Sequence, residues 1–155
     1  MSVATEWLEQ VRIASGRIEE LTRDIVALEY ARAECVPWQP KGSGASVATG
    51  GVHSDPTQRD ALAREGLEER IRLARYQLDE CESLVGDCLR LLDSVSRHVS
   101  QRASFVLEIY YIDRADTWSE VAREMGCARS SVGFLRDQAL TWLNFVGIEY
   151  AIDSA

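Results

Sequence analysis

The side chains best suited to a chemical role lie in one short run, which contains Arg129, Ser130, Ser131, Phe134 and Arg136. An arginine can donate two hydrogen bonds to a guanine, a serine can reach a phosphate or several bases, and a phenylalanine can touch a thymine methyl group. On the outer side of a helix, such residues can read base edges in the major groove of DNA. On an ordinary surface helix they would only face water, so the elements around them decide the interpretation.

The helix expected in front of this run has a clear start signal. Thr117 stands at an N-cap position and Glu120 follows three residues later, which is the pattern of a capping box. Gly126 then falls where a helix-turn-helix needs its tight turn, a position that often requires positive φ. The inward face of this helix is predicted to contain Trp118, Val121, Ala122 and Met125.

A second helix is predicted to start after Ala128, with two sides of different character. Its inner face is predicted to contain Val132, Leu135, Ala139, Leu140 and Leu143. That register leaves the arginines, the serines and Phe134 on the outer side of the amino-terminal end. The two helices together predict a helix-turn-helix module whose second helix enters a major groove.

The same stretch resembles the fourth conserved region of bacterial sigma factors over residues 100–146. That region has a Thr-x-x-Glu-Ile-Ala/Gly helix, a glycine, a short turn and an Arg-led second helix that ends in Ala-Leu. The matching residues here are Val106-Leu107, Tyr110-Tyr111-Ile112-Asp113, Thr117-Trp118-Ser119-Glu120-Val121-Ala122, Gly126, Arg129-Ser130-Ser131-Val132 and Ala139-Leu140. With a helical hairpin in front of it, the chain more closely resembles small phage-encoded regulators with a sigma-region-four-like module, including late-gene transcription activators of the ArpU and RinA kind.

The resemblance implies a sequence-specific transcriptional regulator, phage- or prophage-encoded, that binds double-stranded DNA, and it leaves open a contact with RNA polymerase. Primary sigma factors carry an Arg-Glu-Arg cluster and a Gln on the outer face, and of these only Arg129 is kept here. The standard promoter element is therefore not the expected target. The predicted DNA-binding residues are Thr117, Arg129, Ser130, Ser131, Phe134 and Arg136.

Two heptad runs precede the module and predict two long helices. The first run contains Trp7, Val11, Ala14, Ile18, Leu21, Ile25 and Leu28, and the second contains Leu67, Ile71, Ala74, Leu78, Cys81, Val85, Cys88, Leu92 and Val95. Asp55-Pro56 supplies an N-cap residue and a first-turn proline for the second helix. An antiparallel, coiled-coil-like hairpin buries both stripes within one chain, and a parallel coiled coil between two chains is the alternative. A homodimer built on the hairpin stays open.

The expected organisation is all-α, with two parts. Residues 1–96 are predicted to form the helical hairpin, interrupted at about 35–56 by a flexible loop that contains all three prolines and several glycines. Residues 97–155 are predicted to form the helix-turn-helix domain. The acidity is uneven, with 11 basic and 17 acidic residues in the first part and 6 basic and 8 acidic residues in the second.

Several function classes are excluded by composition and motif. The net charge of −8 argues against general coating of nucleic acid, because such binding comes from Lys and Arg neutralising phosphates. The four cysteines show no CxxC pair, and no secretory leader or membrane-spanning stretch is recognised, which predicts a cytoplasmic protein. No metal-ligand spacing, phosphate loop or nucleophile motif is found, so we expect no enzyme, no cofactor and no metal.

Two other functions stay open. The helix-turn-helix could serve an oligomeric DNA-packaging adaptor, as in small terminase subunits, with the hairpin driving assembly. It could instead be a protein-binding sigma mimic that occupies RNA polymerase without touching DNA, which the negative charge would tolerate.

Overall fold

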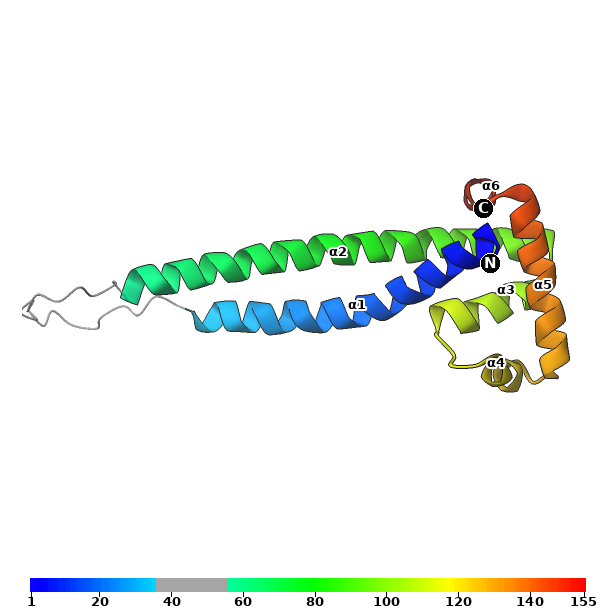
Figure 1. The fold of residues 1–155 in the computed structure, drawn as a ribbon, viewed down its shortest axis with the longest axis horizontal. Helices are drawn as coiled ribbons and strands as arrows, with labels where there is room; N and C mark the ends of the chain where they lie inside the picture. Colours follow the sequence, from blue (N-terminus) through cyan, green and yellow to red (C-terminus); the bar gives the residue numbers. More distant parts are fainter. Residues whose placement is uncertain (36–55) are drawn as a thin grey trace, which may run out of the picture. The chain divides into compact units, whose positions relative to one another are not determined.

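The computed structural model describes residues 1–35 and 56–155, and every regular element in this part of the chain is a helix, without a strand (Figure 1). The all-α prediction is confirmed. The predicted flexible loop lies almost wholly outside the described residues, as does Asp55. The elements in order are α1 Val3–Glu34, α2 Pro56–His98, α3 Gln101–Leu107, a π-helical stretch η1 Glu108–Ile112, α4 Trp118–Met125, α5 Arg129–Val146 and α6 Ile148–Asp153.

The chain packs as two compact units, Met1–Glu20 with Leu78–Ala155, and Leu21–Gln77. The predicted division at 96/97 does not coincide with them, because the start of α1 and the end of α2 bury side chains in one core with α3, α5 and α6. In the unit Leu21–Gln77, both heptad runs supply buried side chains, namely Leu21, Ile25, Ile71 and Ala74. Arg75 and Glu29 form an ion pair there.

The larger unit has two hydrophobic cores. The first joins α1 and α2 to the carboxy-terminal helices through Leu8, Val11, Leu91, Leu92, Val95, Leu107, Tyr111, Leu143 and other side chains. The second lies under α4 and contains Val106, Ala115, Val121, Ala122 and Val132. Tyr110, Trp118 and Leu135 pack against both cores, so these three side chains tie the position of α4 to the rest of the unit.

Two buried serines fix the short helices on α2. Ser94 donates to the carbonyl of Ala151 at 2.6 Å, and Ser104 donates to the carbonyl of Leu92 at 2.8 Å. Buried hydroxyls need such partners, because an unmade hydrogen bond in a core costs about 1–3 kcal/mol. Through these bonds α6 and α3 are each anchored to α2.

The short helix that follows α2 changes its type along its length. Ser100 caps it by accepting from the amide of Ala103 at 3.0 Å, so α3 starts at Gln101, and its continuation widens into η1. Two side chains near the start of α1 donate hydrogen bonds to carbonyl groups at the end of η1. Ser15 donates to Ile112 O at 2.7 Å, and Arg12 donates to Tyr110 O. Carbonyl groups in the last turn of a helix have no donor within the helix, so the side chains of Ser15 and Arg12 supply the missing donors.

Within the described residues, no helix is long and apolar enough to cross a membrane.

Candidate functional site

The start of α4 is capped much as the sequence predicts. Thr117 has extended backbone, and its hydroxyl accepts from the amide of Glu120 at 3.2 Å. The Glu120 carboxylate reaches back to the amide of Asp116, at 2.9 Å, and not to that of Thr117. Two amide groups at this helix end are therefore satisfied by side chains, and the first turn of α4 is fixed.

The turn between α4 and α5 depends on Gly126. Its backbone is left-handed, with φ 64° and ψ 34°, and it closes α4 as the C-cap residue. The amide of Cys127 then donates to the carbonyl of Ala122 at 3.0 Å, as in the usual glycine-terminated helix end. Because this turn occupies only residues 126–128, α5 starts at Arg129, where the sequence placed it.

A column of stacked side chains holds α4 against the unit. The rings of Tyr110 and Trp118 are nearly parallel, with centroids 3.8 Å apart. Arg12 lies over the Tyr110 ring at 4.4 Å, and Arg136 lies over the Trp118 ring at 5.1 Å. Arg136 also pairs with Asp137 at 3.0 Å, and its side chain is only 32% exposed. The structure thus places Arg136 in a packed column, whereas the sequence placed it with the outward residues.

Four of the other five predicted residues line one or the other of two hollows. Ser130, Ser131 and Phe134 line an open hollow of about 380 Å³ together with Arg102 and Leu135. Arg129, the first residue of α5, is exposed. Thr117 lines a different hollow, with Asp116, Ser119, Glu120 and Arg123. The structure therefore groups three of the six predicted residues and adds Arg102 from α3, which sequence reasoning missed.

Arg102 and Arg129 share an electrostatic property. Among the arginines of the larger unit, these two have no hydrogen bond, ion pair or ring contact. Each lies in the first turn of its helix, and neither α3 nor α5 has an acidic residue in that turn. Cations are disfavoured at helix amino-termini by about 0.3–1 kcal/mol. These ends carry positive charge from both the side chain and the backbone, so together they suit an anion.

The amino-terminus of α5 also lacks a side-chain cap. Ala128 stands at the N-cap position and makes no capping hydrogen bond through its side chain. Amide groups in an uncapped first turn stay available to a ligand, and phosphate groups bind at such helix ends. With Ser130 and Ser131 exposed beside them, the first turn of α5 offers several hydrogen-bond donors to one phosphate or base edge.

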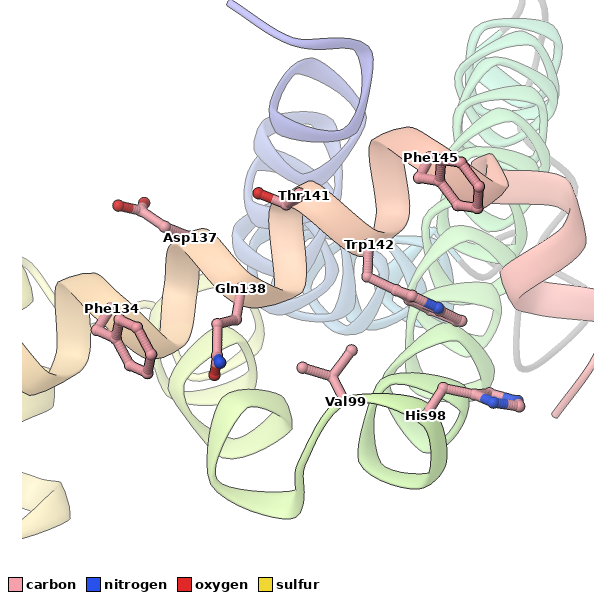
Figure 2. Close-up of a pocket in the computed structure, with 8 residues that line it drawn as sticks. All are labelled: His98, Val99, Phe134, Asp137, Gln138, Thr141, Trp142 and Phe145. Atoms are coloured by element: carbon pink, nitrogen blue, oxygen red, sulfur yellow. The ribbon is translucent and has the colours of Figure 1, made fainter.

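A third hollow, which is apolar and has a volume of about 700 Å³, runs along the outer side of α5 (Figure 2). It is lined by His98, Val99, Phe134, Asp137, Gln138, Thr141, Trp142 and Phe145. Phe134 is 64% exposed and Phe145 is 88% exposed, and His98 stacks on Trp142 with ring centroids 5.3 Å apart. No Arg or Lys lines this hollow, so its chemistry differs from that of the hollow beside Arg102. Sequence reasoning did not single out Phe145.

Two buried groups of the core hold their protons strongly. Burial, with the charge of Glu9 adding, raises the pKa of Tyr111 to about 12. Burial and the nearby Glu108 raise the pKa of Cys88 to about 12. Both groups are therefore neutral at physiological pH, and a thiol with a raised pKa is a poor nucleophile. No cluster of three metal-ligating side chains occurs in residues 1–35 and 56–155.

Comparisons with protein-family models, with curated proteins and with solved structures found no match to this chain.

Proposed function

We propose that this protein is a sequence-specific regulator of transcription whose α4, turn and α5 form a helix-turn-helix that binds double-stranded DNA. The observation that carries the proposal is the pair of unpartnered arginines, Arg102 and Arg129, beside the uncapped start of α5. Phosphate contacts supply most of the affinity for DNA, and helix amino-termini and arginines are typical donors to them.

The local geometry supports α5 as the reading helix. The capped start of α4 and the left-handed Gly126 give the compact helix-turn-helix spacing, and they leave the first turn of α5 exposed. Ser130 and Ser131 have short side chains that let a DNA backbone approach closely. In this arrangement Arg129 and the serines contact base edges or phosphates, and Arg102 contacts the flanking backbone.

The remaining residues take supporting roles in the proposal. Thr117 caps α4, Arg136 packs on Trp118, and the column ending at Arg12 connects α4 to the start of α1. We infer that α1 and α2 form an antiparallel hairpin, since Glu29 pairs with Arg75 while Val11 and Leu92 share a core. The hairpin would then be a scaffold, and its acidity keeps it away from DNA. A contact with RNA polymerase and a phage origin rest only on the resemblance to sigma region four.

An assembly adaptor of the small-terminase type is the second candidate. The observation in its favour is the apolar hollow on α5, since exposed apolar patches mark protein interfaces. In that case DNA binding would lack sequence preference and the protein would form rings.

Selection from a randomised pool of duplex DNA tests the proposal directly. The regulator predicts enrichment of one site over successive rounds, bound by a monomer or dimer. Binding without enrichment, by ring-sized oligomers in light scattering, would support the adaptor. Failure to retain any duplex at low salt would reject both functions and leave a protein-binding module.

A further inference from the structure

The outer side of α5 carries a stripe of four residues, Phe134, Gln138, Thr141 and Phe145, which we call the α5 stripe. The spacings of four, three and four residues place all of them on one face of a helix. All four line the same apolar hollow, and Figure 2 shows the two phenylalanines on either side of Gln138 and Thr141 along the helix. A stripe of this kind is typical of a surface that packs against another helix.

The order of the α5 stripe is symmetric, with an aromatic residue at each end and two polar residues between them. We propose that the α5 stripe binds a second copy of this chain, with the two α5 helices antiparallel about a two-fold axis. A two-fold axis midway between Gln138 and Thr141 sets Phe134 of each copy against Phe145 of the other copy. The same axis sets Gln138 against Thr141, so that an amide and a hydroxyl can form a hydrogen bond across the interface.

The charges around the hollow favour a protein partner. Asp137 is the one acidic residue among its lining residues, and no Arg or Lys joins them. The Asp137 carboxylate is paired with Arg136, which is not among the lining residues, so no unpaired cation faces the hollow to bind a phosphate, and this disfavours DNA on this part of α5.

The rim of the α5 stripe also supports the antiparallel pairing. Asn144 uses its side-chain oxygen to accept from the amide of Ala4 at 3.2 Å, which leaves its NH₂ group as a donor. Asp137 and Asn144 lie on the same flank of the α5 stripe, about 2.5 and about 4.5 residues from the two-fold axis, so that in the pair their levels along the helices differ by only about 3 Å. In the antiparallel pair, Asp137 of each copy therefore lies beside Asn144 of the other, where the carboxylate can accept from the amide.

The exposed phenylalanine side chains of the α5 stripe can supply about half of the buried area that a stable interface needs. Two phenylalanines from each copy, at roughly 150 Å² or more apiece, bury on the order of 600 Å² in total. A stable interface typically needs about 1,200 Å² or more, and exposed parts of Val99, Trp142 and Leu135 lie next to the α5 stripe to supply the rest.

The dimer does not depend on the proposed DNA binding, but it is compatible with it. At a rise of about 1.5 Å per residue, the first turns of the two α5 helices lie roughly 30 Å apart. Successive half-sites on DNA are about 34 Å apart, so both reading ends fit one face of a duplex. Phe134 then belongs to the protein interface, and DNA contact falls to Arg102, Arg129 and the two serines.

A charge exchange across the interface tests both the surface and its register. The proposed dimer contains two Phe134–Phe145 contacts, one on each side of the two-fold axis, and we call each of them a layer. In a dimer of either variant, Phe134→Glu or Phe145→Lys, a charge faces an aromatic ring in both layers. Each variant alone should raise the dissociation constant of the dimer at least about thirtyfold in sedimentation velocity. Mixed together, they should form a heterodimer, because one layer then pairs the introduced glutamate with the introduced lysine and the other keeps two phenylalanines.

Leu62→Glu is the matched control, since Leu62 is 61% exposed on α2, in the other unit. It should leave the dimer unchanged, and circular dichroism should show all three variants folded. A monomeric wild type, full dimerisation of either single variant, or loss of dimer in the Leu62 variant would overturn the proposal. A mixture that stays monomeric would overturn it as well, because it would exclude the antiparallel register.

Discussion

The ring of Trp118 lies flat on the ring of Tyr110, with centroids 3.8 Å apart and an interplanar angle of 11°. Trp118 is the first residue of α4, and Tyr110 belongs to η1. Because Arg12 covers the tyrosine and Arg136 covers the tryptophan, four side chains from α1, η1, α4 and α5 form one column. The position of α4 beneath α5 is thus coupled to the start of α1.

Removal of the column should affect stability more than DNA affinity. Arg136→Ala is expected to lower the free energy of unfolding by about 0.5–1 kcal/mol, the usual value of an exposed or half-exposed cation–π contact. Trp118→Ala should lower it by roughly 2–4 kcal/mol, since a large aromatic side chain is lost from between two cores. Urea unfolding measures both values. If Arg136→Ala left stability unchanged and abolished binding to duplex DNA, Arg136 would be a DNA-contacting residue instead.

Gly126 should resist substitution. Gly126→Ala puts a side chain at φ 64°, which costs about 1–2 kcal/mol, although nothing lies within 4 Å of the added carbon. Gly86→Ala is the control, because Gly86 lies inside α2 with equally open surroundings and ordinary φ. That change should stabilise the protein by about 0.5–1 kcal/mol. Equal effects of the two substitutions on the urea midpoint would contradict the left-handed turn.

Thr117 is expected to act through the helix cap. Thr117→Ala should lower the free energy of unfolding by about 1 kcal/mol, and Thr117→Ser should restore most of it, because either hydroxyl can accept from the amide of Glu120. Chemical denaturation of the three proteins provides the comparison. A serine variant as unstable as the alanine variant would show that the methyl group, and not the cap, is what matters.

Alkaline pH should weaken the fold through Tyr111 and Cys88. The pKa of Tyr111 is raised from 10 to about 12 and that of Cys88 from 9 to about 12. In the unfolded chain these groups lose their protons first, so their stabilisation is complete below pH 9 and is lost as pH rises toward 12. Tyr111→Phe should therefore flatten the fall of the urea midpoint above pH 10. An unchanged slope would contradict the burial of the tyrosine hydroxyl.

Much of the fold could be predicted from local pattern. Heptad spacing identified Val11, Leu21 and Ile71 as buried, and the capping residues and glycine located the ends of α4. The pattern missed Leu8, Leu91 and Ser94, which lie off the heptad stripes and are fully buried. These residues are covered by α5, α6 and their neighbours, so their burial depends on contacts between segments far apart in sequence.

The candidate site was predicted less completely for a similar reason. Helical periodicity predicts which side of α5 faces outward. It cannot show that Trp118 of α4 packs on part of that side, where Arg136 lies over its ring. Nor could it bring Arg102 to the start of α5, because α3 and α5 meet only in the folded core. A signal for Arg102 was present in its position just after the capping Ser100, where an unpaired cation is unusual.

The salt dependence of duplex binding, measured by fluorescence anisotropy, tests the central claim most directly. Wild-type protein should bind with an affinity that falls steeply with salt, and Arg102→Ala and Arg129→Ala should each weaken binding and reduce the slope of log K against log[salt] by about 1. Arg70→Ala on α2 is the control, since Arg70 is an exposed arginine of the other unit, and it should behave as wild type. Affinity and slope unchanged in both site variants, or no binding even at low salt, would contradict the claim that Arg102 and the start of α5 contact DNA.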